Sequence, residues 1–521
     1  MKLTIVLLLA AVSCARGHHI LCVFQVPSHS HHQLGKGIVD PLLKAGHTVT
    51  WITPYPEKIG KNIPKNLNVI DIGVVKKYVS NVDMSQSKTF NGGIAFVKQF
   101  ANNLTLEMLA VPAVRDALVK TQFDAVVTEA FFCDILAGIA AIQQVPWIVL
   151  SGIQMYPFLE QQVDEVRSVA TIPLMFNICN TPMSFLSRAF NALIYMGMAA
   201  GQLLDRPYTL SLYDSTFSPL AAARGVTLPP FDDAFHNVSI MFVNSHESLS
   251  PTFSIPPNVV SIAGYHIDEN PPPLPKDLQE LLDKSTQGVI YFSMGSVLRS
   301  STLQPHTRAA LLRVFAALPY TVLWKFEEPL TGLPPNVHVR PWLPQPSVLE
   351  HPNVRLFITH GGQLSSLEAV RAGVPLLAIP VFGDQPSNAE RAQRAGYARR
   401  VTFDPGMADD VEKALKEMLS NDRYTKRVKH LSKLFRARPE SPSQLVKHYV
   451  ELAIDTKGAY HLRSLSLQYS WYQRWMLDLV LALLAVIITI LALITFLIKT
   501  CIRKVKGTNT KAPKFNNKKN N

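Results

Sequence analysis

Cysteine is scarce in this chain of 521 residues, which contains five of them. Cys14 and Cys501 lie near the ends, so the central part holds only Cys22, Cys133 and Cys179. Three widely spaced thiols provide neither a disulfide framework nor the spacing of zinc ligands. At most one disulfide can form, and we expect Cys22, inside an apolar segment, to be packed as a thiol.

Acidic residues are also comparatively few, with 38 Asp and Glu against 51 Lys and Arg, a formal net charge of +13. Eight of the cations lie in residues 499–521 and two in residues 1–17, and neither segment contains an acid. Without these ten charges the rest of the chain carries only +3. The basic balance therefore reflects the ends of the chain, and we expect no nucleic-acid partner.

The first of two long apolar runs covers residues 3–12, directly after Met1-Lys2. Small residues follow it, which is the pattern of a secretory signal peptide, and we assign this peptide to residues 1–17. The run is too short to span a membrane. A buried first strand or helix is the alternative, but an apolar strand pattern begins only at Ile20.

The second apolar run, residues 479–498, contains no charged residue in 20 positions. This is the length of a transmembrane helix, whereas a buried core helix is rarely so uniformly apolar. Trp471, Tyr472 and Trp475 precede the run as an interfacial belt, and a basic tail at 499–521 follows it. We expect a single-pass type I membrane protein with its bulk in the lumen and its tail in the cytosol.

Two short patterns refine this location. Lys518 and Lys519 stand fourth and third from the C-terminus, like the dilysine retrieval signal of endoplasmic-reticulum membrane proteins. A solvated, disordered tail is the plainer interpretation, and both can hold together. Sequons at Asn103 and Asn237 are candidate glycosylation sites in the lumen.

A proline-rich segment divides the central part of the chain. Residues 270–275 read Asn-Pro-Pro-Pro-Leu-Pro, a stiff linker that we place at 271–280. Strand patterns alternate with helical patterns on both sides, and the expected strands are residues 20–26, 48–53, 124–128, 147–150, 288–292, 321–324, 354–358 and 376–379. The alternation predicts two doubly wound α/β domains, 18–270 and 281–470, with a ligand cleft between them. The last helices of the second domain are able to pack back on the first.

The stretch from Trp342 to Ala389 carries the strongest functional pattern. After the strand at 354–358, a His-Gly-Gly turn opens a helix over residues 363–372. Free backbone N–H groups and the positive end of the helix dipole bind phosphate at such a turn. Glu368 on this helix and Asp384-Gln385 after the next strand lie at the same sheet edge and suit sugar hydroxyls. The stretch therefore predicts a nucleotide-sugar site.

These residues resemble the donor-binding motif of the UDP-glycosyltransferases. The matching segments are, in order, Trp342-Leu343-Pro344-Gln345, His351-Pro352, Phe357-Ile358-Thr359-His360-Gly361-Gly362, Glu368-Ala369, Gly373-Val374-Pro375 and Asp384-Gln385. The resemblance runs from residue 20 to the C-terminal tail, and residues 27–31 and 44–47 look most like insect members, especially those of Lepidoptera. It implies a GT-B fold, with an N-terminal Rossmann-like domain for the acceptor and a C-terminal one for the UDP-sugar.

The resemblance also implies roles for individual residues. Trp342 would stack on uracil, and Gln345 would bond the edge of that base. Glu368 would bind the ribose hydroxyls, and Asp384 with Gln385 the hydroxyls of the transferred sugar. A further polar set would hold the pyrophosphate or lie near its charge: Ser293, Ser296, Lys325, His360, Gly362 and Ser365.

Catalysis needs a base for the acceptor hydroxyl, and histidine titrates in the suitable range. His29, His31 and His32 follow the first expected strand. In the family the base stands 16 residues before the histidine of a Gly-His pair, here His47, and this spacing selects His31. A metal site at the cluster is the weaker interpretation, because no carboxylate or cysteine completes it.

The base also needs an acidic partner that orients it. The family's aspartate follows six residues after the phenylalanine of a Phe-Asp pair, and counting from Phe123 gives Glu129, which is one methylene longer. Asp134 is the fallback. The implied reaction is an inverting displacement in which the deprotonated acceptor attacks the anomeric carbon and UDP leaves. The sequence contains no Asp-X-Asp motif, and we expect neither metal nor cofactor.

The insect-like match favours UDP-glucose as the donor, with UDP-glucuronate as the alternative. The acceptor should be a small lipophilic phenol or alcohol, as in detoxification by conjugation, and Phe131, Phe132 and residues 155–158 are candidates for its cleft or for the core. A catalytically silent UDP-sugar-binding partner subunit is a second alternative, against which His31 argues. A type I membrane adhesion or receptor protein is a third alternative. Such a protein should have a longer cytosolic tail and no phosphate-binding turn. A homo-oligomer is compatible with this reading.

Overall fold

The computed structural model describes residues 17–60, 62–79, 93–163, 169–174, 177, 179, 181–250, 255–474 and 476–508. The expected signal peptide, apart from Gly17, and the Lys518-Lys519 pair lie outside these residues, as does Trp475. The chain divides after Arg463 into two compact units, each of which is described by itself.

The first half of the larger unit is built on a seven-stranded parallel sheet with the strand order β3-β2-β1-β4-β5-β6-β7. Its strands are β1 (His19–Val23), β2 (Thr48–Thr53), β3 (Leu67–Asp71), β4 (Ala125–Glu129), β5 (Trp147–Ser151), β6 (Val238–Val243) and β7 (Val259–Ser261). Its α-helices are α2 (His29–Lys44), α3 (Gly93–Ala110), α4 (Pro112–Lys120), α5 (Ala137–Gln143), α6 (Pro157–Val163), α7 (Phe185–Arg224) and α8 (Phe231–Phe235). Short 3-10 helices lie at Pro56–Lys58 (η1), Gly73–Tyr78 (η2) and Asp134–Leu136 (η4).

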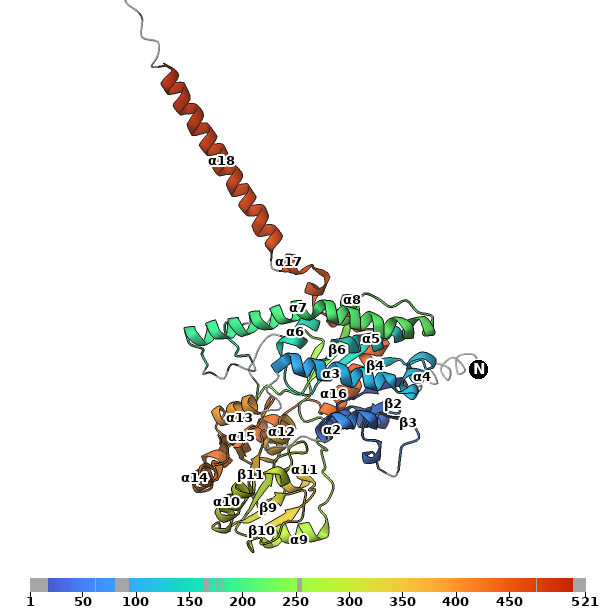
Figure 1. The fold of residues 1–521 in the computed structure, drawn as a ribbon, viewed down its shortest axis with the longest axis vertical. Helices are drawn as coiled ribbons and strands as arrows, with labels where there is room; N and C mark the ends of the chain where they lie inside the picture. Colours follow the sequence, from blue (N-terminus) through green and yellow to red (C-terminus); the bar gives the residue numbers. More distant parts are fainter. Residues whose placement is uncertain are drawn as a thin grey trace, which may run out of the picture. The chain divides into compact units, whose positions relative to one another are not determined.

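The second half contains a six-stranded parallel sheet with the order β10-β9-β8-β11-β12-β13. Its strands are β8 (Val289–Ser293), β9 (Thr321–Lys325), β10 (Val337–Arg340), β11 (Val354–Thr359), β12 (Leu376–Ala378) and β13 (Ala398–Arg400). The accompanying helices are α9 (Lys276–Lys284), η5 (Ser300–Thr302), α10 (Pro305–Ala316), α11 (Gln345–Leu349), α12 (Gln363–Ala372), α13 (Gln385–Arg394), α14 (Met407–Ser420), α15 (Arg423–Arg436), α16 (Pro442–Asp455) and η6 (Tyr460–Leu462). Figure 1 shows the two sheets with their helices.

Both sheets owe their layered structure to strands that are apolar on both faces. All five residues of β4, β5 and β8 are buried, as expected when helices cover a parallel sheet on each side. Each sheet reverses its strand order once, between β1 and β4 and between β8 and β11. Ligands of doubly wound sheets bind at such reversals, outside the carboxyl ends of the strands.

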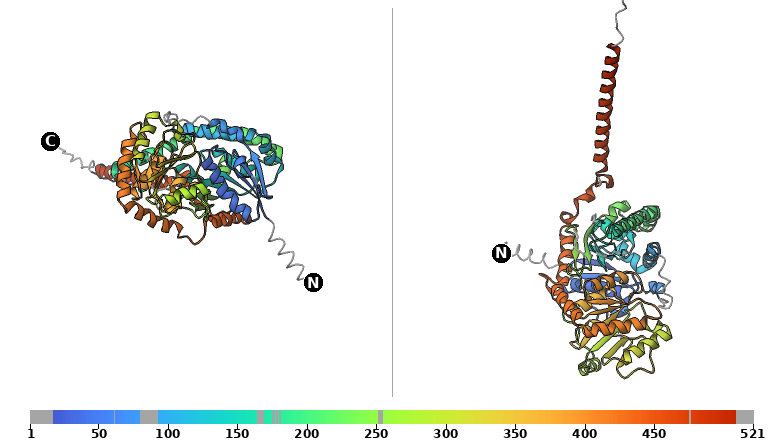
Figure 2. Two further views of the ribbon diagram at one scale, coloured as in Figure 1. Left: turned by 90° about the horizontal axis from the view of Figure 1, so that it is seen from below. Right: turned by 90° about the vertical axis from the view of Figure 1, so that its left-hand side faces the viewer.

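Helix α16 returns from the second half of the unit to the first. Its buried face, with Val446, Val450 and Ala453, joins the apolar cluster that contains Ile20 of β1. The Nε2 atom of His47, which follows α2, lies 3.1 Å from Oε1 of Glu451 on α16. Figure 2 shows these orange C-terminal helices beside the blue first strands and helix. The C-terminal helix α16 therefore packs against the first domain.

The longest helix of the larger unit, α7, spans 40 residues and was not anticipated from the sequence. The side chain of Ser184 accepts a hydrogen bond from the Ser187 N–H at its start, and Gly225 ends it in the left-handed conformation. Two prolines, Pro207 and Pro219, lie inside the helix, where each lacks the backbone N–H that helix interiors use. Packing on the first domain keeps the helix continuous through them.

The smaller unit contains η7 (Leu465–Gln468), α17 (Trp471–Arg474) and α18 (Leu477–Thr508). Among the described residues, α18 supplies the one helix long and apolar enough to cross a membrane. It extends the expected apolar run at both ends. This helix is consistent with a single-pass membrane anchor.

The predicted fold class is confirmed, and most expected strands differ from the observed ones by one to three residues at an end. The segment expected as strand 20–26 is β1 only as far as Val23, because the chain turns there toward the cap of α2 at Ser28. The helix expected at 363–372 has these bounds in α12, since Gly373 takes the left-handed conformation with φ of 73°. The expected ends of helices and strands are therefore most accurate where a turn or cap residue terminates the element.

The packing of α7 generates a prediction with a matched control. Phe217 is fully buried, whereas Phe185 on the same helix is 74% exposed. Replacing Phe217 with Ala should lower the free energy of unfolding by about 3–5 kcal/mol, and Phe185→Ala should change it by less than about 0.5 kcal/mol. Urea denaturation of the detergent-solubilised chain measures both values, and equal effects would show that α7 does not pack as described.

Candidate functional site

His31 and Glu129 meet where the order of the first sheet reverses. His31 lies in the first turn of α2, where its backbone N–H donates to the Ser28 side chain at 3.4 Å. Glu129 is the last residue of β4. The Nδ1 atom of His31 contacts Oε1 of Glu129 within hydrogen-bond distance. The Glu129 side chain is only 2% exposed, against 22% for His31, so a buried carboxylate stands behind an imidazole that solvent can reach.

The fallback partner, Asp134, is engaged elsewhere. Its carboxylate lies 3.2 Å from Nζ of Lys98, which also contacts Asp205 at 2.7 Å. Burial raises the pKa of Asp134, and the Lys98 charge opposes that rise. Of the two candidates, it is therefore Glu129 that the structure brings to His31.

The other two histidines of the cluster have different surroundings. Burial and the charge of Lys58 lower the pKa of His29 to about 3, and that of His32 to about 4. The His32 ring stacks on Trp51 with centroids 4.9 Å apart. Both rings are therefore neutral near pH 7, and neither contacts a carboxylate as His31 does. His32 serves the packing of α2 on the sheet.

The predicted phosphate site lies at the reversal of the second sheet. His360 and Gly362 follow β11, and Ser293 ends the neighbouring strand β8. A Cβ atom on Gly295 would lie 2.6 Å from the His360 ring, and one on Gly362 would lie 2.5 Å from it. The imidazole is thus held between two glycines. Burial and the nearby Lys325 charge lower the pKa of His360 to about 4, so it offers a neutral ring N–H.

The remaining members of the phosphate set surround this turn. The Ser293 hydroxyl accepts from the Gly295 N–H at 3.3 Å, while Ser296 is exposed. The ammonium of Lys325 donates to the Gly295 carbonyl at 2.8 Å and lies 2.9 Å from Glu327 Oε1. Lys325 therefore braces the turn as well as supplying charge beside it.

The predicted ribose and uracil residues form one hydrogen-bonded group. The Gln345 amide donates to Glu368 Oε2 at 2.6 Å and to the Ser365 hydroxyl at 2.9 Å, and it accepts from Tyr291 at 3.1 Å. From the first domain, Nε2 of His266 lies 3.5 Å from Glu368 Oε1. These contacts fix the orientation of Glu368 in the middle of α12.

Trp342, the predicted uracil platform, lies between the two halves of the unit. It is 51% exposed. The ring of His29 meets it edge-on with centroids 4.4 Å apart, and the ammonium groups of Lys58 and Lys325 lie 5.3 and 5.5 Å from its ring centroid. The N-terminal half thus supplies a cation and a histidine to the face where the base is expected.

Asp384 and Gln385 both lie at the start of α13, but their side chains are used differently. Asn388 donates to Asp384 Oδ2 at 2.6 Å and to the Gly361 carbonyl at 3.1 Å. Burial raises the pKa of Asp384, while Asn388, Arg391 and His31 act against that rise. The Gln385 side-chain oxygen accepts from the N–H groups of Val381 and Phe382. Gln385 therefore shapes the loop before α13, and Asp384, which is only partly buried, is the more accessible acceptor of the two.

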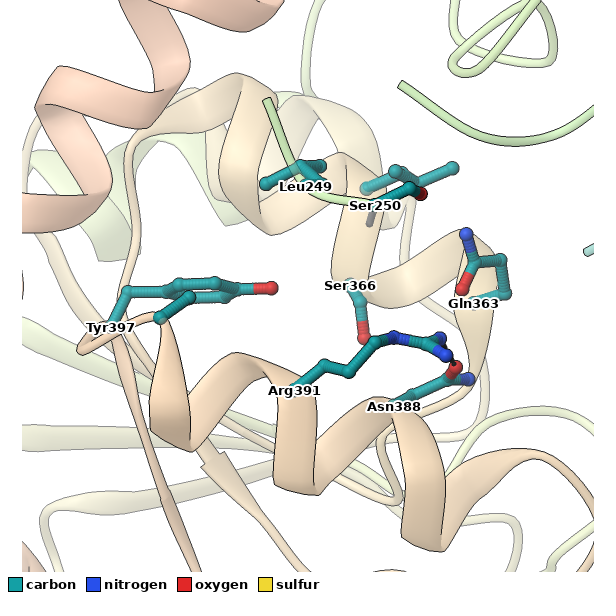
Figure 3. Close-up of a pocket in the computed structure, with 9 residues that line it drawn as sticks. Leu249, Ser250, Gln363, Ser366, Asn388, Arg391 and Tyr397 are labelled. Atoms are coloured by element: carbon teal, nitrogen blue, oxygen red, sulfur yellow. Dashed lines mark hydrogen bonds between the residues drawn. The ribbon is translucent and has the colours of Figure 1, made fainter. Parts of the chain in front are cut away.

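Arg391 extends this arrangement to a small pocket. Figure 3 shows its guanidinium beside Asn388, to which it donates a hydrogen bond. The pocket lies between α12 and α13 and is lined by Leu249, Ser250, Gln363, Ser366, Leu367, Asn388, Arg391, Ala395 and Tyr397. Its lining shares no residue with the predicted donor set. Arg391 therefore reaches Asp384 both by its charge and through its hydrogen bond to Asn388.

An aromatic group lies beside His31. Phe131 meets the His31 ring edge-on at 5.2 Å between centroids. Phe132 contacts Phe131, Tyr156 and Phe158, with centroids 5.3 to 6.0 Å apart. Tyr156 and Phe158 are buried core residues, whereas Phe131 and Phe132 are only partly buried. Phe131 and Phe132 are thus the members of the predicted acceptor set that lie nearest to the base.

The two sequons are structurally engaged. The Thr105 hydroxyl is fully buried and donates to the Ala101 carbonyl within α3. At the second sequon, Arg463 donates to Asn237 Oδ1 at 2.7 Å and to the Ser239 hydroxyl at 3.1 Å. Glycosylation at Asn103 and Asn237 stays a prediction.

Sequence reasoning missed Lys58, His266, Asn388 and Arg391. Asn388 stands four residues after Asp384 and Arg391 three residues further, so their shared helix face was a readable signal. Lys58, the last residue of η1, and His266, in a turn after β7, approach the site from the other half. No local sequence pattern predicts that these two residues lie at the site, because their positions depend on the packing of the two halves.

Comparison with known proteins shows the family and the fold of the chain. The family model described as UDP-glucoronosyl and UDP-glucosyl transferase matches residues 23–512. The UDP-glucosyltransferase 2 of Dactylopius coccus is 31% identical over 502 residues, covering 94% of both chains. The UDP-glucuronosyltransferase 2C1 of Oryctolagus cuniculus is 27% identical, covering 89% of this chain and 94% of its own. An ecdysteroid UDP-glucosyltransferase of Mamestra brassicae nuclear polyhedrosis virus is 27% identical, with coverage of 84% and 85%.

Solved structures support the fold. The glycotransferase of kitacinnamycin superimposes with a TM-score of 0.58 at 21% identity, covering 84% of this chain and 99% of that one. The glycosyltransferase SnogD from Streptomyces nogalater gives a TM-score of 0.53 at 17% identity, with coverage of 84% and 100%. Both share the GT-B arrangement of two parallel sheets. The family match over nearly the whole chain, together with this fold, identifies the chain as a member of the UDP-glycosyltransferase family and as a glycosyltransferase.

Proposed function

We propose that the chain transfers a hexose from a UDP-sugar to the hydroxyl of a small lipophilic acceptor, with inversion at the anomeric carbon and His31 as general base. The observation that carries the proposal is the contact of His31 Nδ1 with the buried carboxylate of Glu129. This contact lies at the carboxyl ends of β1 and β4, on the side where His31 also acts electrostatically on Asp384 of the second domain.

The chemistry of the base follows from the tautomer that Glu129 favours. A carboxylate at Nδ1 keeps the proton on that nitrogen, and Nε2 is then left to accept the proton of the acceptor hydroxyl. The imidazolium formed during attack is stabilised by the same buried carboxylate. Because Phe131 borders the ring, an apolar alcohol or phenol would be held beside Nε2.

The donor half would stabilise the departing UDP without a metal ion. A neutral His360 offers a ring N–H, and the turn at Gly361 and Gly362 presents backbone N–H groups at the start of α12. Lys325 and Lys58 supply positive charge around Trp342. The proposal therefore expects full turnover in the presence of a chelator such as EDTA.

We further assign the protein to conjugation of lipophilic compounds at the endoplasmic-reticulum membrane, with its sheets in the lumen. Support comes from the apolar helix α18 and from the sequence signals at both ends of the chain. Lys518 and Lys519 would retain the protein by a dilysine signal. If a Lys518→Ser/Lys519→Ser double variant stays in that compartment on microscopy, the signal must lie elsewhere.

His31→Ala tests the proposed base directly. The variant should lose turnover by roughly 100- to 10,000-fold, the usual contribution of a general base. UDP binding, measured by calorimetry, should be unchanged, because all predicted donor residues lie in the second half of the larger unit and His31 is not one of them. Retained turnover would remove His31 from the mechanism, and loss of UDP binding would indicate a misfolded variant.

A matched pair of acid-to-amide changes separates the two candidate partners. Glu129→Gln removes the charge behind His31 and should lower kcat by about 100-fold or more, with little change in donor KM. Asp134→Asn leaves His31 and Glu129 in place, so kcat should stay within about threefold of the parent value. Steady-state kinetics of both variants decide the assignment, and the reverse ranking would transfer the role to Asp134.

The donor sugar can be read from competing substrates. The proposal favours UDP-glucose, which is supported by the insect relative described as a glucosyltransferase. A glucuronate carboxylate would also meet the like charge of Asp384, at a cost of about 1–3 kcal/mol. Mass-spectrometric product ratios should favour glucoside by roughly 10- to 100-fold, and predominant glucuronide would assign the alternative donor.

A further inference from the structure

Helix α7 carries a face that the described fold leaves uncovered. Eight large apolar side chains between Phe185 and Tyr208 are 52% to 83% exposed. They are Phe185, Leu186, Phe190, Leu193, Met196, Leu203, Leu204 and Tyr208. Soluble proteins rarely expose so many neighbouring large apolar side chains. We refer to these eight residues as the α7 apolar face.

The eight positions share one side of the helix. Leu186, Phe190, Leu193, Leu204 and Tyr208 follow the spacing of three and four residues that keeps side chains on the same helix face. The remaining three positions form the adjacent row. No charged residue occurs between Arg188 and Asp205. The apolar surface thus covers about half of the helix circumference over some 36 Å at 1.5 Å per residue.

The opposite side of α7 is firmly attached to the first domain. Asn191 is fully buried, and its amide donates to the Val169 and Ile172 carbonyls at 2.7 and 2.9 Å. Further along, Tyr213 and Phe217 are buried in the main apolar cluster. A helix with one face so engaged lies on the protein surface and does not span a membrane by itself.

The same helix provides an internal contrast. Between Tyr208 and Pro219, the exposed positions of α7 are Ser211, Asp214, Ser215 and Ser218, all polar, and the exposed positions after them carry only the small side chains of Pro219, Ala222 and Ala223. This is the composition expected of a helix face in water. The change from apolar to polar along one continuous face shows that only the N-terminal part of α7 is adapted to an apolar environment.

We propose that the α7 apolar face lies in the interface of a lipid bilayer, with its side chains inserted between headgroups and acyl chains. The chain carries its own route to that surface, since α18 is apolar enough to span a membrane. Only residues 464–476 separate the larger unit from α18. Thirteen extended residues reach at most about 45 Å, so the face would act at a high effective concentration of lipid.

A second copy of the chain is the competing occupant, because Gly197 and Gly201 stand four residues apart on the exposed side. A helix-to-helix seam is narrow, however, and covers only a stripe of each helix. The α7 apolar face is wider than such a stripe and extends from Phe185 to Tyr208. Its width favours a planar apolar medium.

The proposal also gives the acceptor a path. Met198, on the inward side of α7, packs against the cluster that contains Tyr156 and Phe158 of the predicted acceptor region. A lipophilic acceptor dissolved in the bilayer would therefore reach the cleft from the membrane rather than from water. This consequence rests on the proposed function, whereas the insertion of α7 does not.

The test uses the full chain in phosphatidylcholine vesicles, with Cys179 and Cys501 changed to Ser. An environment-sensitive fluorophore on Leu193→Cys should be quenched by doxyl-labelled lipid and protected from aqueous iodide. The same label on Ser218→Cys, in the polar part of α7, should show the reverse. Equal iodide quenching at both positions overturns the proposal. Protection from iodide without lipid quenching, together with cross-linking between chains at position 193, assigns the face to a second copy.

A kinetic arm separates membrane docking from the chemistry. The triple variant Leu186→Gln/Leu193→Gln/Leu204→Gln should keep kcat and KM for a water-soluble phenol and raise KM for a bilayer-partitioning one. The polar control Ser211→Ala/Ser215→Ala/Ser218→Ala should change neither. If the apolar-face variant keeps both KM values, delivery of acceptor through the membrane is excluded even where insertion holds. If neither phenol is glycosylated by the unmodified protein, the proposed function fails while the fluorescence result stands.

Discussion

The arrangement of the site depends on a carboxylate buried at the end of a strand. Glu129 is almost inaccessible to water, and one of its oxygens contacts Nδ1 of His31. Its second oxygen is buried without a hydrogen-bond partner among the described residues. A buried carboxylate without a partner is strongly destabilising. If His31 moved away, Glu129 would lose its contact and the folded state would be destabilised. The imidazole is thereby held in one orientation.

The fold supplies this contact through the reversal of strand order between β1 and β4. The chain leaves β1 through the Ser28 cap of α2, which sets His31 in the first helical turn. Strand β4 runs parallel to β1 and ends at Glu129. The second sheet also places a histidine at its reversal of strand order, between β8 and β11, where His360 lies between two glycines. Each sheet thus contributes one histidine at its reversal of strand order: His31 lies beside a carboxylate, and His360 lies at the turn predicted to bind phosphate.

Contacts between the two halves of the larger unit then determine how these sites face each other. Lys58 and His29 of the first half lie against Trp342 of the second. The Gln363 amide donates to the Asn244 carbonyl at 2.9 Å, and α16 packs on β1 and α2. These contacts limit how far the donor half can move from His31. The proposed reaction needs that restriction, because attack requires the acceptor and the donor sugar to be in contact.

The sequence predicted the parts of this design that have local signals. Glycines at strand ends and the helix at 363–372 led to the predicted donor turn, whereas the spacing from His47 that selected His31 came from the family resemblance. The sequence could not predict Lys58, His266 or the continuity of α7, since these depend on packing between distant segments. The family resemblance gave Glu129 as a substitute for aspartate, and its extra methylene still allows contact with His31. The uncovered face of α7 could not be predicted for the same reason, since it depends on which side of the helix packs on the first domain.

The stereochemistry of the product tests the central claim most directly. A base at His31 that activates the acceptor for direct attack gives a single displacement, which inverts the anomeric carbon. Proton NMR of the glucoside made from UDP-α-glucose should therefore show the β-anomer, recognised by the large coupling between its axial protons. Formation of the α-anomer would contradict the account, because retention requires a nucleophile on the protein, such as Asp384, and a second displacement.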